Sequence, residues 1–176
     1  MTSPSPITPD TKDWTWVLER PCPDCGLDAS TVTRDRLGAA IRDNAAGWPA
    51  VLEAPTATTR PRPEVWSATE YACHVRDVHV LFGQRVELML ADDGARFANW
   101  DQDATAIEQR YDQQEPGAVA AELLAAAERA AVIYDGVPDD AWGRRGVRSN
   151  GDAFTVESLG RYHLHDVFHH LWDVRQ

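Results

Sequence analysis

Four of the six histidines of this protein lie in one short segment near its end, which reads His163-Leu164-His165-Asp166-Val167-Phe168-His169-His170-Leu171-Trp172-Asp173-Val174. Two aspartates are interleaved with them. Imidazole and carboxylate are the usual ligands of first-row divalent metals. On a helix, residues four apart share one face, so Asp166/His170 and His165/His169 are both suited to chelate an ion. Two ligands from one helix and a third from another leave coordination positions open, which is typical of a catalytic metal site.

Helical periodicity extends over most of the chain upstream of this segment. Apolar residues at spacings of three and four predict a helix over about 30–52. A capping box at Ser67-Ala-Thr-Glu70 opens a second helix that runs to about Asp92. Pro116 begins a third helix that ends near Tyr134, and Thr155 caps the last one. The 135–153 loop is rich in glycine and has room for a short hairpin. No segment alternates with a period of two, so we predict an all-α four-helix bundle over 30–176, preceded by an N-terminal extension over 1–29.

Composition excludes several classes of partner. The 176 residues carry a formal net charge of -11, which argues against binding nucleic acid or an anionic membrane, because both need clustered cations. No run of about 18 apolar residues predicts a membrane span. The N-terminal residues lack a basic and apolar leader. We therefore expect a cytoplasmic protein whose thiols stay reduced.

Two of the three cysteines form the turn Cys22-Pro-Asp-Cys25-Gly26. A structural zinc site needs four ligands, and there is no second C-x-x-C. A thioredoxin-like site would follow a strand, and none is predicted here. A tight turn with two half-buried thiols is the favoured interpretation. Cys73 falls inside the second helix and is expected to be a small core residue.

The histidines of the second helix have different surroundings. His74 falls in the apolar stripe, where a lone histidine is more often a hydrogen-bonded core residue than a ligand. The His/Asp-rich last helix reverses that preference, since ligands on facing helices converge inside bundles. His79 is expected at the surface or behind the ligands. Periodicity alone does not choose between the two pairs on the last helix: one pair could bind while the other is solvated, or neither could bind a metal.

At these residues the chain resembles the DinB-like superfamily of four-helix metalloproteins, which includes mycothiol-dependent maleylpyruvate isomerase, the bacillithiol transferases and the metal-binding domain of ergothioneine synthase. The resemblance rests on Glu70-Tyr-Ala-Cys-His74-Val-Arg-Asp77, on the 142–155 connection, and on His169-His170-Leu-Trp-Asp173. It implies an up-down-down-up bundle with the metal ligands His74, Asp166 and His170. Asp is shorter than the Glu or His of the family, which keeps the His165/His169 pair open.

The resemblance also implies a low-molecular-weight thiol as a partner. Several members use a divalent metal, with zinc favoured here and nickel or iron as alternatives, to hold such a thiol as a thiolate. Arg76 and Arg85 of the second helix are the candidates to contact the carboxylates of this thiol. Every basic residue except Lys12 is arginine, as in high-GC genomes, and this favours mycothiol.

The leading functional hypothesis is thus a metal-dependent thiol S-transferase or isomerase that acts on a small electrophile. The alternative is a non-catalytic metal-binding stress protein with the same site. A third hypothesis is a purely structural bundle that forms a homodimer and whose histidines are inert.

Overall fold

The computed structural model describes residues 7–8 and 13–176. Its long helices begin where the sequence places caps. Helix α3 (Ala68–Ala91) starts at Ser67, whose hydroxyl accepts from the Glu70 amide while the Glu70 carboxylate accepts from the Ser67 amide. Helix α6 (Val156–Asp173) starts at Thr155 in the same way, with Ser158 as the reciprocal partner. Helix α5 (Pro116–Asp135) has proline in its first turn. These three helices confirm the predicted boundaries.

The first predicted helix is interrupted. Its residues form two single turns of 3-10 helix, η2 (Ala29–Thr31) and η3 (Arg34–Arg36), and two α-helices, α1 (Leu37–Ala45) and α2 (Trp48–Leu52). Pro49 explains the break, because proline has no amide hydrogen for the Ala45 carbonyl and its ring collides with that carbonyl. A continuous helix over 30–52 was therefore wrong.

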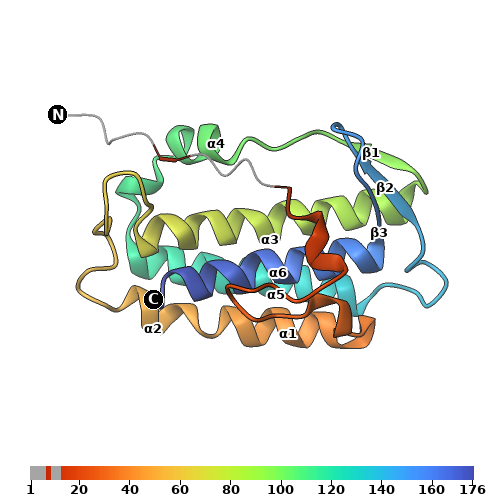
Figure 1. Ribbon diagram of the computed structural model, residues 1–176, viewed down its shortest axis with the longest axis horizontal. Helices are drawn as coiled ribbons and strands as arrows, with labels where there is room; N and C mark the ends of the chain where they lie inside the picture. Colours follow the sequence, from red (N-terminus) through yellow and green to blue (C-terminus); the bar gives the residue numbers. More distant parts are fainter. Residues whose placement is uncertain (1–6, 9–12) are drawn as a thin grey trace.

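Helices α1, α3, α5 and α6 form the predicted up-down-down-up bundle (Figure 1). Contacts between side chains fix the directions. Arg76 of α3 pairs with Glu122 of α5, and Gly83 lies beside Ile133, so these two helices run parallel. Gly160 of α6 lies against Leu37, and Gly47, which follows α1, lies against Leu171. Helices α1 and α6 are therefore also parallel, in the opposite direction.

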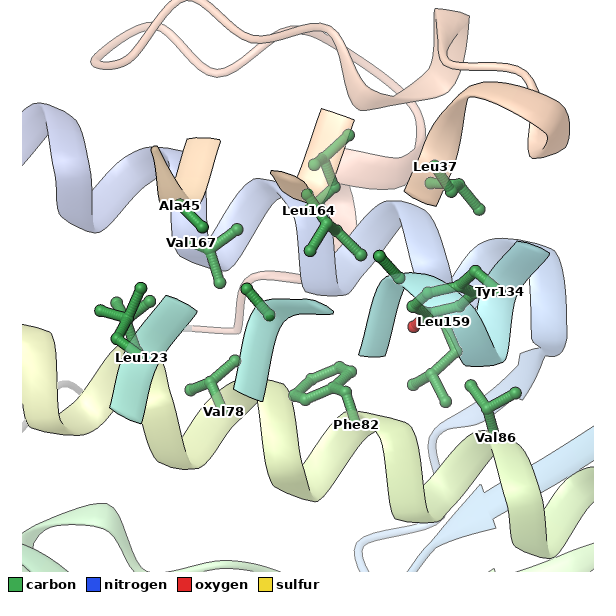
Figure 2. Close-up of a cluster of buried hydrophobic side chains, with 14 of the residues drawn as sticks. Leu37, Ala45, Val78, Phe82, Val86, Leu123, Tyr134, Leu159, Leu164 and Val167 are labelled. Carbon is green, nitrogen blue, oxygen red and sulfur yellow. The ribbon is translucent and has the colours of Figure 1, made fainter. Parts of the chain in front are cut away.

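The bundle interior is mostly apolar, with a few buried histidines. Figure 2 shows side chains from all four long helices converging between them. Those labelled are Leu37, Ala45, Val78, Phe82, Val86, Leu123, Tyr134, Leu159, Leu164 and Val167. The apolar stripe of α6 faces this core, so the polar residues that flank the stripe face the side of the bundle instead. Within the described residues, no helix is both long and apolar enough to cross a membrane.

The prediction of an all-α fold was wrong in one respect. Strands β1 (Ala95–Phe97), β2 (Arg145–Arg148) and β3 (Ala153–Thr155) form a small mixed sheet where α3 ends and α6 begins (Figure 1). β1 pairs with β2 in parallel, Arg96 opposite Val147, and β2 with β3 forms the hairpin for which the loop had room. The 93–115 connection also contains α4 (Gln102–Glu108) and the 3-10 turn η4 (Tyr111–Gln113).

The N-terminal segment lies across α6 rather than apart from the bundle (Figure 1). Its 3-10 turn η1 (Thr15–Leu18) buries Val17, and the Trp14 ring lies 5.0 Å from that of His169. Residues 1–6 and 9–12 of the predicted extension are outside the described part, and a domain boundary near residue 30 stays a prediction.

Candidate metal centre

Three side chains from two facing helices meet beside the core. His74 comes from the middle of α3, and Asp166 and His170 come from one face of α6. One ligand atom from each lies within 4.8 Å of the other two. The Asp166 Oδ1 atom is 3.7 Å from Nε2 of His74 and 3.7 Å from Nε2 of His170. The structure therefore brings together the three residues predicted as metal ligands, and their role as ligands stays a prediction.

Two residues of this cluster, His74 and Asp166, keep buried polar atoms that are unsatisfied. Both ring nitrogens of His74 and the Asp166 Oδ1 atom are buried without a hydrogen-bond partner among the described residues. A buried polar atom without a partner costs free energy, so native structures rarely keep one without a reason. A divalent cation between the three side chains would satisfy His74 Nε2 and Asp166 Oδ1 together. The residues present thus fit a metal, and three protein ligands would leave further coordination positions open.

Electrostatics keep these groups in the forms that bind metals. Burial lowers the pKa of His74, so its ring is neutral at neutral pH. Burial alone would raise the pKa of Asp166, but the neighbouring His74 and His170 rings hold it well below its ordinary value. His74 therefore offers a neutral imidazole, and Asp166 a negative charge, to the same point.

Asp173 orients one of the ligands from behind. Its Oδ2 atom is 3.0 Å from Nδ1 of His170. Since a carboxylate accepts, this bond places the ring hydrogen on Nδ1, so Nε2, which lies 3.7 Å from Asp166 Oδ1, is the nitrogen with the lone pair. Carboxylate–histidine pairs of this kind commonly support metal ligands and fix the ring orientation.

The cluster opens into a cavity of about 560 Å³. Asp166 and His170 lie in its wall, while His74 is almost fully buried behind them, its ring stacked 5.3 Å from that of Trp100. Aromatic rings form much of the remaining wall, and Arg148 supplies a positive charge. Those rings are Trp14, Trp66, Tyr71, Trp100 and Tyr162. A cavity of this size suits a small molecule, with the metal cluster at its wall.

Arg76 and Arg85 lie away from this cavity. Arg76 pairs with Asp77 and Glu122 and donates to Gln114. Arg85 is 5% exposed and donates to the Ala98 carbonyl, and burial lowers its pKa to about 10. The predicted contact of these two arginines with a thiol cofactor gains no support from this placement. Arg148, the last residue of β2, lines the cavity instead, and no sequence motif marked it.

The other histidines of α3 and α6 lie outside the His74 cluster. His79 was expected at the surface or behind the ligands, and it is buried, with Nδ1 3.0 Å from Nε2 of His163. His163 in turn lies 3.1 Å from the Tyr134 hydroxyl. His165 and His169 belong to a separate group with Cys22 and Cys25. The two pairs on α6 therefore do not compete for one position.

Comparisons with known proteins agree with this architecture. The family model of the DinB superfamily matches residues 50–174, which is most of the chain. No curated protein matches. Among solved structures, the chain is similar to YfiT from Bacillus subtilis, described as "a probable metal-dependent hydrolase with an unusual four-helix bundle topology". The TM-score is 0.71 at 18% identity, over 82% of this chain and 88% of that one. At this identity the likeness shows the fold alone.

Proposed function

Since this chain belongs to the DinB superfamily, we propose that it is a metal-dependent enzyme acting on a small molecule in the cavity beside His74, Asp166 and His170. The observation that supports this proposal best is the coincidence of unsatisfied donors with an open cavity. His74 Nε2 and Asp166 Oδ1 have no hydrogen-bond partner in the described structure, and Asp166 lies in the wall of a cavity large enough for a substrate.

Each residue of the site would have its own role. His74, Asp166 and His170 would hold the ion, zinc by preference and nickel or iron as alternatives. A bound divalent cation would act as a Lewis acid and lower the pKa of a thiol or water beside it. Asp173 would keep the His170 ring in its binding orientation. The aromatic wall would exclude water from the ligand, and Arg148, which pairs with Asp152, would add a positive charge to a wall that also carries Glu64, Asp101 and Asp103.

The finer proposal is that the small molecule includes a low-molecular-weight thiol, with mycothiol as the first candidate. The reaction would be S-transfer to, or isomerisation of, a small electrophile. The resemblance of the His74 and His169-His170 segments to thiol-dependent members of the superfamily supports this choice. The proposal also predicts that the protein is cytoplasmic, because low-molecular-weight thiols stay reduced in the cytoplasm.

Hydrolysis is the second candidate. The fold neighbour YfiT is described as a probable metal-dependent hydrolase, and a three-ligand centre leaves room for water as readily as for a thiol. A non-catalytic metal-binding protein with the same site, as a monomer or a homodimer, is the remaining alternative.

One set of measurements separates these functions. Protein without affinity-tag histidines is loaded with zinc and assayed for conjugation of monochlorobimane with mycothiol, cysteine or no thiol, and for ester and amide hydrolysis. Turnover that needs a thiol supports the transferase, and turnover without thiol supports the hydrolase. If the protein binds metal tightly but shows no turnover, the non-catalytic alternative is the one supported.

The ligand assignment is tested by substitution. Asp166→Ala and His170→Ala should each weaken metal binding at this centre at least about tenfold, because each removes one of three protein ligands. His74→Ala should remove most of this metal while the helical circular dichroism stays unchanged, since the bundle core is apolar. Unchanged metal affinity in all three variants would refute the assignment.

A further inference from the structure

The Cys22–Cys25 turn lies against α6. The Cys22 amide donates to the Leu27 carbonyl, and the Gly26 amide donates to the Cys22 carbonyl, so the segment folds back on itself as the sequence predicted. Gly26 takes a positive φ of 76°, which glycine adopts without strain. The turn directs both thiols to one side. Cys22 is buried and Cys25 is half-buried, and both are free.

The two missing ligands of this C-x-x-C motif come from α6. One donor atom each from Cys22, Cys25, His165 and His169 lies within 4.8 Å of the other three. Zinc bonds of about 2.3 Å to sulfur and about 2.0 Å to nitrogen place the ligand atoms of a tetrahedral site roughly 3.3–3.8 Å apart. The Cys22 sulfur is already 3.6 Å from Nδ1 of His169. Small side-chain adjustments would therefore complete a tetrahedron.

Both histidines present a lone pair that lacks another use. The His165 side chain is 4% exposed, and its Nε2 atom is buried without a hydrogen-bond partner within the described part of the chain. His169 has Nδ1 toward Cys22, and its Nε2 atom lies 3.7 Å from Asp173 Oδ1, which favours a hydrogen on that outer nitrogen. A buried ring nitrogen without a partner, in a residue of this group, points to a ligand there.

We propose that Cys22, Cys25, His165 and His169 form a second, structural zinc site, separate from the cluster around His74. Two sulfur and two nitrogen donors in a tetrahedral arrangement select zinc over magnesium, calcium or manganese. Binding would release the two thiol protons to solvent, and the resulting Zn²⁺ with two thiolates and two neutral imidazoles carries no net charge. Such a neutral unit suits a mostly buried position.

The two clusters differ in the way structural and catalytic sites differ. The Cys22 group offers four protein ligands, which closes the coordination sphere. The His74 group offers three and opens into the cavity. The ring centroids of His169 and His170 are 6.2 Å apart, so the structural ion would sit beside the catalytic one. This inference does not depend on the proposed enzymatic function.

The second site would hold one wall of the cavity in place. Trp14 lines the cavity, and its ring lies 5.5 Å from that of His165 and 5.0 Å from that of His169. The segment that carries Trp14 leads directly to Cys22. An ion between the turn and α6 would therefore fix both the N-terminal segment and the aromatic wall.

The test uses the full chain without affinity-tag histidines, loaded with zinc or cobalt and freed of excess metal by gel filtration. Elemental analysis should give two ions per chain for the wild type and for Cys73→Ala, a control because the Cys73 thiol is buried and donates to Gln114. Cys25→Ser and His169→Asn should each retain one ion, as should His74→Ala. The cobalt protein should show a sulfur-to-cobalt charge-transfer band in the near ultraviolet that persists in His74→Ala and is lost or strongly reduced in Cys25→Ser.

Two further readouts do not depend on variants folding. Zinc should protect Cys22 and Cys25 of the wild type from iodoacetamide, and a chelator should expose them, as read by mass spectrometry. Cleavage by a glutamyl endopeptidase after the exposed Glu19 should become faster in the chelated protein. One ion per chain that is lost entirely in His74→Ala, with no thiolate band, would overturn the proposal. A Cys22–Cys25 disulfide in protein purified under reducing conditions would overturn it as well.

Discussion

Acid should destabilise this protein through His79, whose side chain is 1% exposed. Burial lowers its pKa from the ordinary 6.5 to about 4. At a pH between these two pKa values, His79 carries a proton in the unfolded chain but not in the folded chain. The free energy of unfolding therefore decreases as the pH drops. At pH 4.5 the unfolded state is almost fully protonated and the folded state largely neutral. The difference amounts to about 2.5 kcal/mol relative to pH 7.5, at about 1.4 kcal/mol for each pKa unit.

The assay compares urea unfolding of the wild type and His79→Gln at pH 7.5 and pH 4.5, in the presence of a chelator. Glutamine does not titrate, and its amide can still bond to His163 across the 3.0 Å contact. Histidines that do not contact His79 titrate equally in both proteins, so their contributions cancel in the comparison. Burial lowers the pKa of His163 in both proteins, and the variant relieves His163 only of the repulsion from a charged His79. The wild type should lose about 2.5 kcal/mol more than the variant between the two pH values. Equal losses would refute the link between burial and acid sensitivity at His79.

Three further substitutions test other parts of the structure. Asp173→Ala should weaken metal binding at the His74 centre about ten- to a hundredfold in a chelator competition, because His170 loses the carboxylate that orients it. Arg60→Met should cost about 3 kcal/mol in urea unfolding at pH 7, because Glu70 stays buried as an unpaired charge. Burial alone would raise the Glu70 pKa, but the Arg60 and Ser67 contacts hold it lowered, so without Arg60 the Glu70 carboxylate should gain a proton more readily and the cost should shrink as the pH falls. Gly146→Ala should lower the thermal midpoint and cost about 1–3 kcal/mol, because the new methyl would lie 2.5 Å from the Phe97 ring.

Local signals in the sequence determine most of the bundle. The capping box at Ser67, the proline at the start of α5 and the Thr155 cap each define a boundary through residues within one helical turn. Strand β1 has no such signal. Ala95–Phe97 is extended because it pairs with β2, some fifty residues later, and three residues are too few to show a period of two.

The candidate sites also depend partly on local sequence signals and partly on contacts between distant segments. The i, i+4 spacing on α6 made Asp166/His170 and His165/His169 both visible as chelating pairs, and the sequence resemblance joined His74 to the first. The sequence did not join the Cys22–Cys25 turn to the His165/His169 pair, because only a second C-x-x-C motif was expected to complete a zinc site with this turn. The H-x-x-x-H spacing of His165 and His169 is the usual complement of C-x-x-C in a Cys₂His₂ site, although here it follows at an unusual distance. Which helix face meets the turn depends on the tertiary fold.

The contact between Cys22 and His169 joins residues 147 positions apart in the chain. A bridge there would close a ring around almost the entire bundle, and rings of this length restrict the denatured ensemble strongly. For a covalent cross-link the chain-entropy argument gives about 5 kcal/mol at 25 °C. The ring also imposes an order on biosynthesis, because α6 is made long after the Cys22–Cys25 turn. The turn must therefore wait, with its thiols unprotected, until α6 has left the ribosome.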